Sequence, residues 1–108
     1  MILMQLSVLA RFSIRGMAIF PFILVSRSEL KKDPILINHE KIHLRQQLEM
    51  LVVFFYLFYT LEFLYHLLML NDKNQAYLSI SFEKEAYYQE TDLGYLKTRP
   101  FWAFRKYY

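Results

Sequence analysis

The segment His39-Glu40-Lys41-Ile42-His43 decides how the rest of this 108-residue chain must be arranged. Residues four apart lie on one face of a helix, so His39 and His43 can direct their imidazole nitrogens at a single metal ion. Asp33-Pro34 precedes the segment and predicts the start of that helix, with an N-cap acceptor followed by proline at the first helical position. Because the chain has no cysteine, any further protein ligand must be a histidine or a carboxylate.

The stretch from Ile35 to Leu70 contains no glycine or proline, which fits one continuous helix. A straight helix from His43 to Leu70 would rise about 40 Å, at about 1.5 Å per residue. A ligand from the segment after Leu70 would then lie a full helix length from the two histidines. We therefore expect a break near residues 49–55, which separates the helix of the histidines from a second, apolar helix. The alternative is a third ligand from another molecule.

Two glutamates are the candidates for the third ligand. Glu83 and Glu85 belong to a helix predicted over Phe82–Thr91, with Ser81 as its N-cap. Since residues two apart point in different directions on a helix, only one of the two should reach the metal. His66 lies in the apolar second helix, where a histidine is more often part of the core than a ligand.

The segment before the histidines predicts a small amount of β structure. Met17–Val25 is rich in β-branched and aromatic residues and predicts a short edge strand or hairpin, because Pro21 cannot donate to a ladder. Met1–Ser13 fits a short helix or a strand, and Ala76–Ser81 fits a short strand or an irregular segment. We therefore expect one compact domain over residues 1–108, mainly α and at most α+β.

Composition and charge limit the partners that we expect. A hydrophobic share of 56% and an aromatic share of 19% exclude a disordered chain. The net charge of +3 is too small to predict a nucleic-acid partner, and it suits an anionic membrane surface better. Leu48–Leu70 is long enough to span a bilayer, but Glu49, Glu62 and His66 would be costly at membrane depth.

The second helix and the chain ends bear on location and assembly. The aromatic run Val52–Tyr59 is hard to bury in so small a domain, which predicts a homodimer or a membrane surface. The basic, aromatic tail Lys97–Tyr108 fits an interfacial anchor, a cover over the core or a plug over a cleft. No basic segment precedes the apolar first ten residues, so we expect no secretory signal peptide and a cytoplasmic or inner-membrane-associated protein.

The two histidines followed some forty residues later by Glu83-x-x-Ala86 resemble the gluzincin branch of the zincin metallopeptidases. In that branch, two histidines of an active-site helix and a glutamate of a later "glutamate helix" bind zinc. The scale resembles the minigluzincins, single-domain members with active-site, backing and glutamate helices. The segments 37–47 and 82–87 also resemble a sequence pattern shared by a set of small bacterial HExxH proteins. Phe20-Pro21-Phe22 is similar to a cleft-lining strand of integral-membrane sensor peptidases.

The resemblance implies a zinc metallopeptidase, active or latent, with a peptide or protein substrate. Zn²⁺ would be held by His39, His43 and Glu83, and Glu40 would be the general base. Zinc lowers the pKa of a bound water towards neutrality, and Glu40 would take its proton as the water attacks a peptide carbonyl. The alternative function is a non-catalytic zinc-binding or helical interaction protein, with membrane association as one form of it.

One position departs from the gluzincin pattern. Gluzincins usually carry an aspartate four residues after the ligand glutamate, which orients a ligand histidine through a hydrogen bond. Tyr87 stands at that position here and is a weaker acceptor, while Asp92 and Glu49 are the carboxylates that can replace it. Gln46 and Gln47 are expected to solvate the helix. The residues that can donate to an oxyanion are Tyr87, Tyr88, His66 and Arg105.

Overall fold

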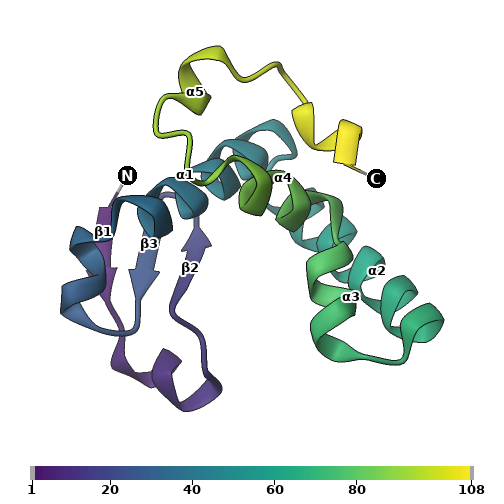
Figure 1. Cartoon of the computed structure of the whole chain (residues 1–108), viewed down its shortest axis with the longest axis horizontal. Helices are drawn as coiled ribbons and strands as arrows, with labels where there is room; N and C mark the ends of the chain where they lie inside the picture. The colour runs from purple at the N-terminus through teal and green to yellow at the C-terminus, as the bar shows by residue number, and fades with distance from the viewer. Residues whose placement is uncertain (1, 108) are drawn as a thin grey trace.

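A three-stranded sheet forms the N-terminal part of the computed structural model, which describes residues 2–107 (Figure 1). The central strand β3 pairs in parallel with β1 and antiparallel with β2. The hairpin alternative predicted for Met17–Val25 is therefore confirmed, and Pro21 lies in its turn. A 3₁₀ helix follows β1 and another follows β3. The bounds are β1 Ile2–Gln5, η1 Ser7–Phe12, β2 Gly16–Ile19, β3 Phe22–Val25 and η2 Ser28–Lys32.

Helix α1, Pro34–Glu49, carries both site histidines. Its start is as predicted, because the Oδ1 atom of Asp33 accepts from the backbone N–H groups of Ile35 and Leu36, each at 3.1 Å. The expected break is also confirmed, since α1 ends at Glu49 and α2 runs from Val53 to Leu70. Leu51, in the junction, has a φ of 51°, a left-handed conformation that reverses the chain without a glycine.

Two short helices follow α2 and correct two sequence predictions. Helix α3, Lys73–Ser79, replaces the strand or irregular segment expected at Ala76–Ser81, and Asp72 caps it by accepting from two backbone N–H groups. Ser81 is not an N-cap, because its hydroxyl donates to Glu62 while Ile80 holds the cap position. Helix α4 covers Ser81–Gln89, and the chain ends with α5 Tyr95–Thr98 and η3 Ala103–Tyr107.

Two clusters of buried side chains hold the elements together. Ala18, Ile23 and Val25 of the sheet pack against Leu44 of α1 in one buried cluster. A second cluster joins Phe55 of α2 to aromatic residues of α4 and the tail, where the rings of Phe82 and Phe104 lie 4.6 Å apart. The C-terminal tail thus packs over the core, which is one of its three predicted positions.

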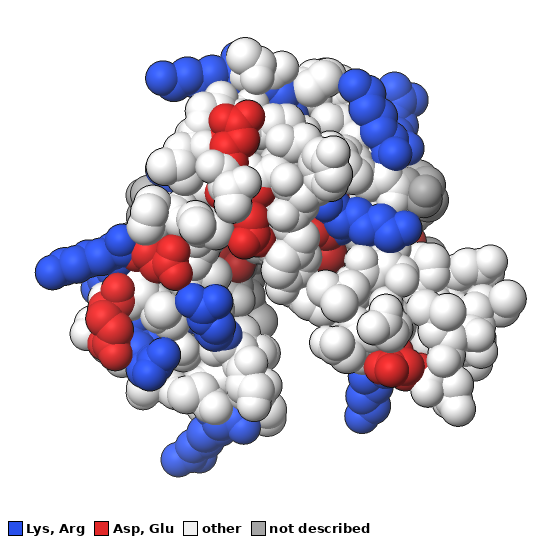
Figure 2. All heavy atoms as spheres, in the orientation of Figure 1, with Lys and Arg blue, Asp and Glu red and all other residues white. Residues whose placement is uncertain are grey.

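The sheet and the α2–α3 pair extend from α1 as two arms (Figure 1). A hollow separates these arms in the space-filling view (Figure 2). The radius of gyration is 13.6 Å, close to the value of about 13 Å for a compact chain of this length. The fold is a compact, mainly α domain with a small sheet, as the sequence predicts.

Candidate metal centre

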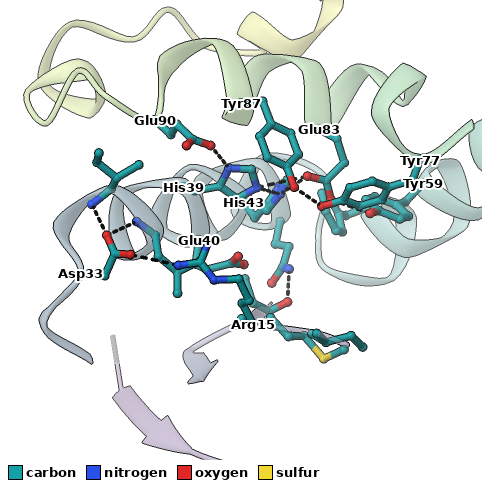
Figure 3. Close-up of a pocket in the computed structure, with 18 of the residues that line it drawn as sticks. Arg15, Asp33, His39, Glu40, His43, Tyr59, Tyr77, Glu83, Tyr87 and Glu90 are labelled. Atoms are coloured by element: carbon teal, nitrogen blue, oxygen red, sulfur yellow. Dashed lines mark hydrogen bonds and ion pairs between the residues drawn. The ribbon is translucent and has the colours of Figure 1, made fainter. Parts of the chain in front are cut away.

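Three side chains predicted to bind a metal meet at one point between α1 and α4. The Nε2 atoms of His39 and His43 lie 3.2 Å apart, and Oε1 of Glu83 lies 3.1 Å and 3.0 Å from them, respectively (Figure 3). All three residues are buried. The break after α1 makes this convergence possible, because it folds the chain back so that α4 lies beside α1.

This donor set fits a single bound metal ion. Atoms that each lie about 2.0–2.2 Å from one ion are separated by about 3.0–3.5 Å, which matches the three measured separations. Two imidazoles and one carboxylate are the donors of many mononuclear centres of zinc and other first-row metals. The group of His39, His43 and Glu83 can therefore hold a metal ion, and a fourth position on the cleft side is free of protein ligands among the described residues.

The second nitrogen of each imidazole is held by an acceptor. Nδ1 of His39 lies 2.9 Å from Oε1 of Glu90, and Nδ1 of His43 lies 2.8 Å from Oε1 of Gln46. Both partners are acceptors, so Nδ1 of each ring carries a proton and Nε2 is the nitrogen that faces Glu83. This arrangement orients both Nε2 atoms for a metal ion, which would replace any proton on them.

Gln46 is fixed by its own hydrogen bonds. Its Nε2 atom donates to the carbonyl of Phe82 at 3.1 Å and to Oε1 of Glu85 at 2.9 Å. Because the amide nitrogen is used in these two bonds, its oxygen must face His43. The prediction that Gln46 and Gln47 solvate the helix is wrong, since both side chains are fully buried.

The two candidate glutamates of α4 point in different directions, as their spacing requires. Glu83 faces the histidines, whereas Glu85 accepts from Nε of Arg99 at 2.5 Å and from the hydroxyl of Tyr95 at 2.7 Å. Arg99 also donates to Glu49 at 2.6 Å. Glu85 and Glu49 thus belong to a buried ion-pair network beside the centre.

Electrostatics keep Glu83 ionised and pair it with the two imidazoles. Burial alone would raise the pKa of Glu83, but the two histidines beside it hold that pKa far below its usual range. Burial lowers the pKa of His43, yet the charge of Glu83 and the hydrogen bond to it prevail and raise the pKa to about 9. The other oxygen of Glu83 accepts from the hydroxyl of Tyr59 at 2.5 Å, which fixes the carboxylate. Burial raises the pKa of Tyr59, so the hydroxyl remains a donor.

Glu40 lies in α1 next to His39, with its carboxylate at the wall of the same cleft (Figure 3). It is 5% exposed, and burial raises its pKa against the opposing effect of the two histidines. Gly16 of β2 passes directly over it, because a Cβ atom at Gly16 would lie 3.4 Å from Oε2 of Glu40. Glycine therefore allows the strand to approach this carboxylate closely.

The cleft has a volume of about 540 Å³ and is open to solvent between the two arms. Its wall includes β2, α1, α2, α3 and α4, and Tyr77 and Tyr87 place their hydroxyls 2.8 Å apart within it (Figure 3). Of the predicted oxyanion donors, Tyr87 alone is among the lining residues. Tyr88 packs near Tyr107, His66 against Tyr65 and Arg105 over Trp102.

The cleft-facing edge of β2 is partly occupied by side chains. Gln47 accepts from the backbone N–H of Phe20 at 2.7 Å and donates to the carbonyl of Ala18 at 2.7 Å, so its amide takes the place of a neighbouring strand residue. The hydroxyl of Tyr56 donates to the same carbonyl at 2.6 Å. Within residues 2–107, the outward N–H and C=O of Gly16 have no such partner.

Four residues of the centre escaped the sequence analysis. Glu90 takes the orienting position considered for Tyr87, Asp92 and Glu49, and its spacing of seven residues from Glu83 places it on the same helix face. Asp92 instead accepts from the N–H of Gly94. The remaining three, Gln46, Tyr59 and Tyr77, carried no signal in the sequence, because their roles depend on partners from distant segments.

Comparison with protein-family models, with curated proteins and with solved structures found no match. A role for this centre therefore depends on its own geometry: three buried ligand atoms around one point, a carboxylate beside them, and an open cleft above.

Proposed function

We propose that the protein is a zinc-dependent metallopeptidase in which His39, His43 and Glu83 hold the metal and Glu40 is the general base. One observation carries the proposal: the three ligand atoms converge at a buried point that opens into a cleft also lined by Glu40. A non-catalytic metal site has no need of a free carboxylate at its open side. Zinc, when bound, supplies Lewis-acid activation of a water molecule and of the substrate carbonyl.

Glu40 carries the proton in this mechanism. Its raised pKa makes it a stronger base than an ordinary glutamate, so it takes a proton from the water that attacks the carbonyl carbon. It then gives the proton to the amide nitrogen as the C–N bond breaks, and the products are a carboxylate and an amine. Burial raises the pKa of both Tyr77 and Tyr87, so either hydroxyl can donate to the developing oxyanion.

The substrate that fits the cleft is an extended peptide. At the start of the β2–β3 ladder, Ser26 donates its backbone N–H to the carbonyl of Arg15. Because hydrogen-bonded pairs alternate with non-hydrogen-bonded pairs in an antiparallel ladder, the next residue, Gly16, directs its N–H and C=O away from β3 and into the cleft. A peptide strand that pairs with Gly16 would lie directly over Glu40, because only van der Waals distance separates the two residues. The edge of β2 thus supports a peptide substrate over a small molecule.

Metal analysis and two groups of variants test the proposal. Purified protein should contain one zinc, which His39→Ala, His43→Ala and Glu83→Ala should each lose. Glu40→Gln should keep the zinc and lose hydrolysis of a peptide library, whereas Glu29→Gln, at an exposed site in η2, should keep both. A Glu40→Gln protein that still hydrolyses peptides would remove Glu40 from the mechanism.

Two other outcomes would replace the proposed function. Iron in place of zinc would point to oxidation chemistry, since two histidines and a carboxylate also bind non-haem iron. Zinc without hydrolysis of any peptide in the library, by wild-type protein with all three ligands intact, would favour the alternative of a non-catalytic zinc-binding protein.

A further inference from the structure

The outward face of α2 is a continuous apolar stripe. At 3.6 residues per turn, its members fall within about 120° of one another around the helix. Their exposed fractions reach 60% at Tyr65 and 85% at Leu68. No element within residues 2–107 covers them, and the arm that carries α2 and α3 is mostly white in Figure 2. The residues of this α2 stripe are Phe54, Leu57, Phe58, Leu61, Leu64, Tyr65 and Leu68.

The opposite face of α2 makes the internal contacts. Phe55 is buried in the core, Tyr59 bonds to Glu83 and Glu62 accepts from the backbone N–H and the hydroxyl of Ser81, each at 2.8 Å. The helix therefore has one face for the protein and one that the protein leaves uncovered. Its 18 residues have a mean hydropathy of 1.6, which is high enough for a membrane span by length and composition, yet only 6% of them are buried. A core helix of that hydropathy would be mostly buried.

Charges around the α2 stripe complement an anionic surface. Arg45 precedes it and Lys73 follows it, and both are exposed. Two acidic residues near it in the chain turn inward, since Glu49 pairs with Arg99 and Glu62 accepts from Ser81, whereas Asp72 is exposed and caps α3. The stripe thus presents hydrocarbon on a chain whose net charge is +3, a combination that suits an interfacial helix on anionic lipids.

We propose that the α2 stripe docks the protein on an anionic lipid bilayer, with α2 parallel to the membrane plane. A spanning orientation would carry the exposed Lys73, Asn74 and Gln75 of α3 into hydrocarbon, together with the metal centre that Tyr59 supports. A parallel orientation immerses the stripe alone. A second copy of the chain fits less well, because protein interfaces have about one hydrogen bond per 100–200 Å² and the stripe has one hydroxyl, that of Tyr65.

Docking in this way leaves the cleft in water. Phe55, Tyr56 and Tyr59 line it from the side of α2 that faces away from the stripe. The protein would therefore meet chains that lie at or near the membrane surface.

The absence of native cysteine permits a direct test with single fluorescent labels. An environment-sensitive probe on Leu57→Cys, Leu61→Cys or Leu64→Cys should shift to the blue when vesicles of phosphatidylcholine with about one third phosphatidylglycerol are added. The same probe on Leu93→Cys, 59% exposed in the loop after α4, or on Gln75→Cys of α3 should not respond. Quenchers on the lipid chains should show one shallow depth for all three stripe positions.

A paired substitution measures the contribution of the stripe. Leu61→Glu with Leu64→Glu should weaken vesicle binding at least about 100-fold, about tenfold for each leucine, because each substitution removes a buried leucine side chain from the lipid contact. Leu93→Glu is the matched control and should bind as the wild type does. Unchanged circular dichroism spectra would show that all variants are folded, which the exposure of these positions predicts.

Three results would overturn the proposal. A probe depth that is greatest at the middle of α2 would indicate a spanning helix. A blue shift that follows protein concentration and not vesicles would indicate a second copy at the stripe. Equal responses from the stripe and control labels, or none from either, would show that the stripe does not bind lipid.

Discussion

Replacing Glu90 by alanine should weaken zinc binding about 10- to 30-fold. Glu90 accepts from Nδ1–H of His39 at 2.9 Å, and its side chain is 24% exposed. A hydrogen bond to a charged group contributes about 1.5–3 kcal/mol, and partial exposure places this one at the lower end of that range. A loss of about 1.5–2 kcal/mol corresponds to the stated factor. Glu90→Gln keeps an acceptor without the charge and should lose only about threefold.

Competition with a coloured zinc chelator at neutral pH measures this change for each variant. Glu29→Ala, which removes the same charge from an exposed position of η2, is the control and should bind zinc as the wild type does. A Glu90→Ala protein within twofold of the wild type would refute the role of Glu90 in orienting His39. Equal weakening in Glu90→Ala and Glu29→Ala would show that net charge, and not the hydrogen bond, sets the affinity for zinc.

The remaining predictions concern stability, geometry and protons. Arg99→Met should lower the free energy of unfolding by about 3–5 kcal/mol, measured with urea, because it leaves the fully buried Glu85 without its cation. Combining it with Glu85→Gln should recover part of the loss. A change below about 1 kcal/mol would contradict the importance of the pair. Gly16→Ala should keep its zinc but lower kcat/KM of any peptide hydrolysis roughly tenfold, since the new methyl would lie 3.3 Å from Cδ1 of Leu36 and would shift the strand that passes over Glu40. Met17→Ala is the neighbouring control. Zinc binding at pH 7 should release about one proton, because the pKa of His43 near 9 keeps its imidazole protonated before a metal binds. Calorimetry in two buffers of different ionisation enthalpy checks this, and heats that do not depend on the buffer would disprove it.

The sequence predicts those parts of the fold that depend on local chemistry. Asp33 and Pro34 define the start of α1 because capping and a fixed φ are properties of those residues themselves. The break after Glu49 is predicted from distance alone, since a third ligand could not otherwise reach the histidines. Its exact position at Leu51 carries no sequence signal, because a leucine takes the left-handed conformation there without a glycine, next to Met50 in the core.

The parts that escape prediction depend on long-range partners. The sequence suggests a solvated Gln46, because the acceptors of its amide nitrogen, Phe82 and Glu85, belong to the distant helix α4. In the sequence, Tyr59 is one of many aromatic residues in an apolar helix, and only the fold shows that its hydroxyl donates a hydrogen bond to Glu83. Glu90 is the exception, since its helical spacing from Glu83 was visible in the sequence.

The amide of Gln47 makes the two halves of the cleft unequal for a bound peptide. It satisfies the backbone at Ala18 and Phe20, so a peptide that pairs with β2 at Gly16 must leave the strand there. In the other direction, towards Ile14 and Ser13, the lining continues and the path is open. Under the proposed function, a peptide seated over Glu40 would thus have a short side and a long side, and cleavage would fall at a limited distance from a chain end or a bend.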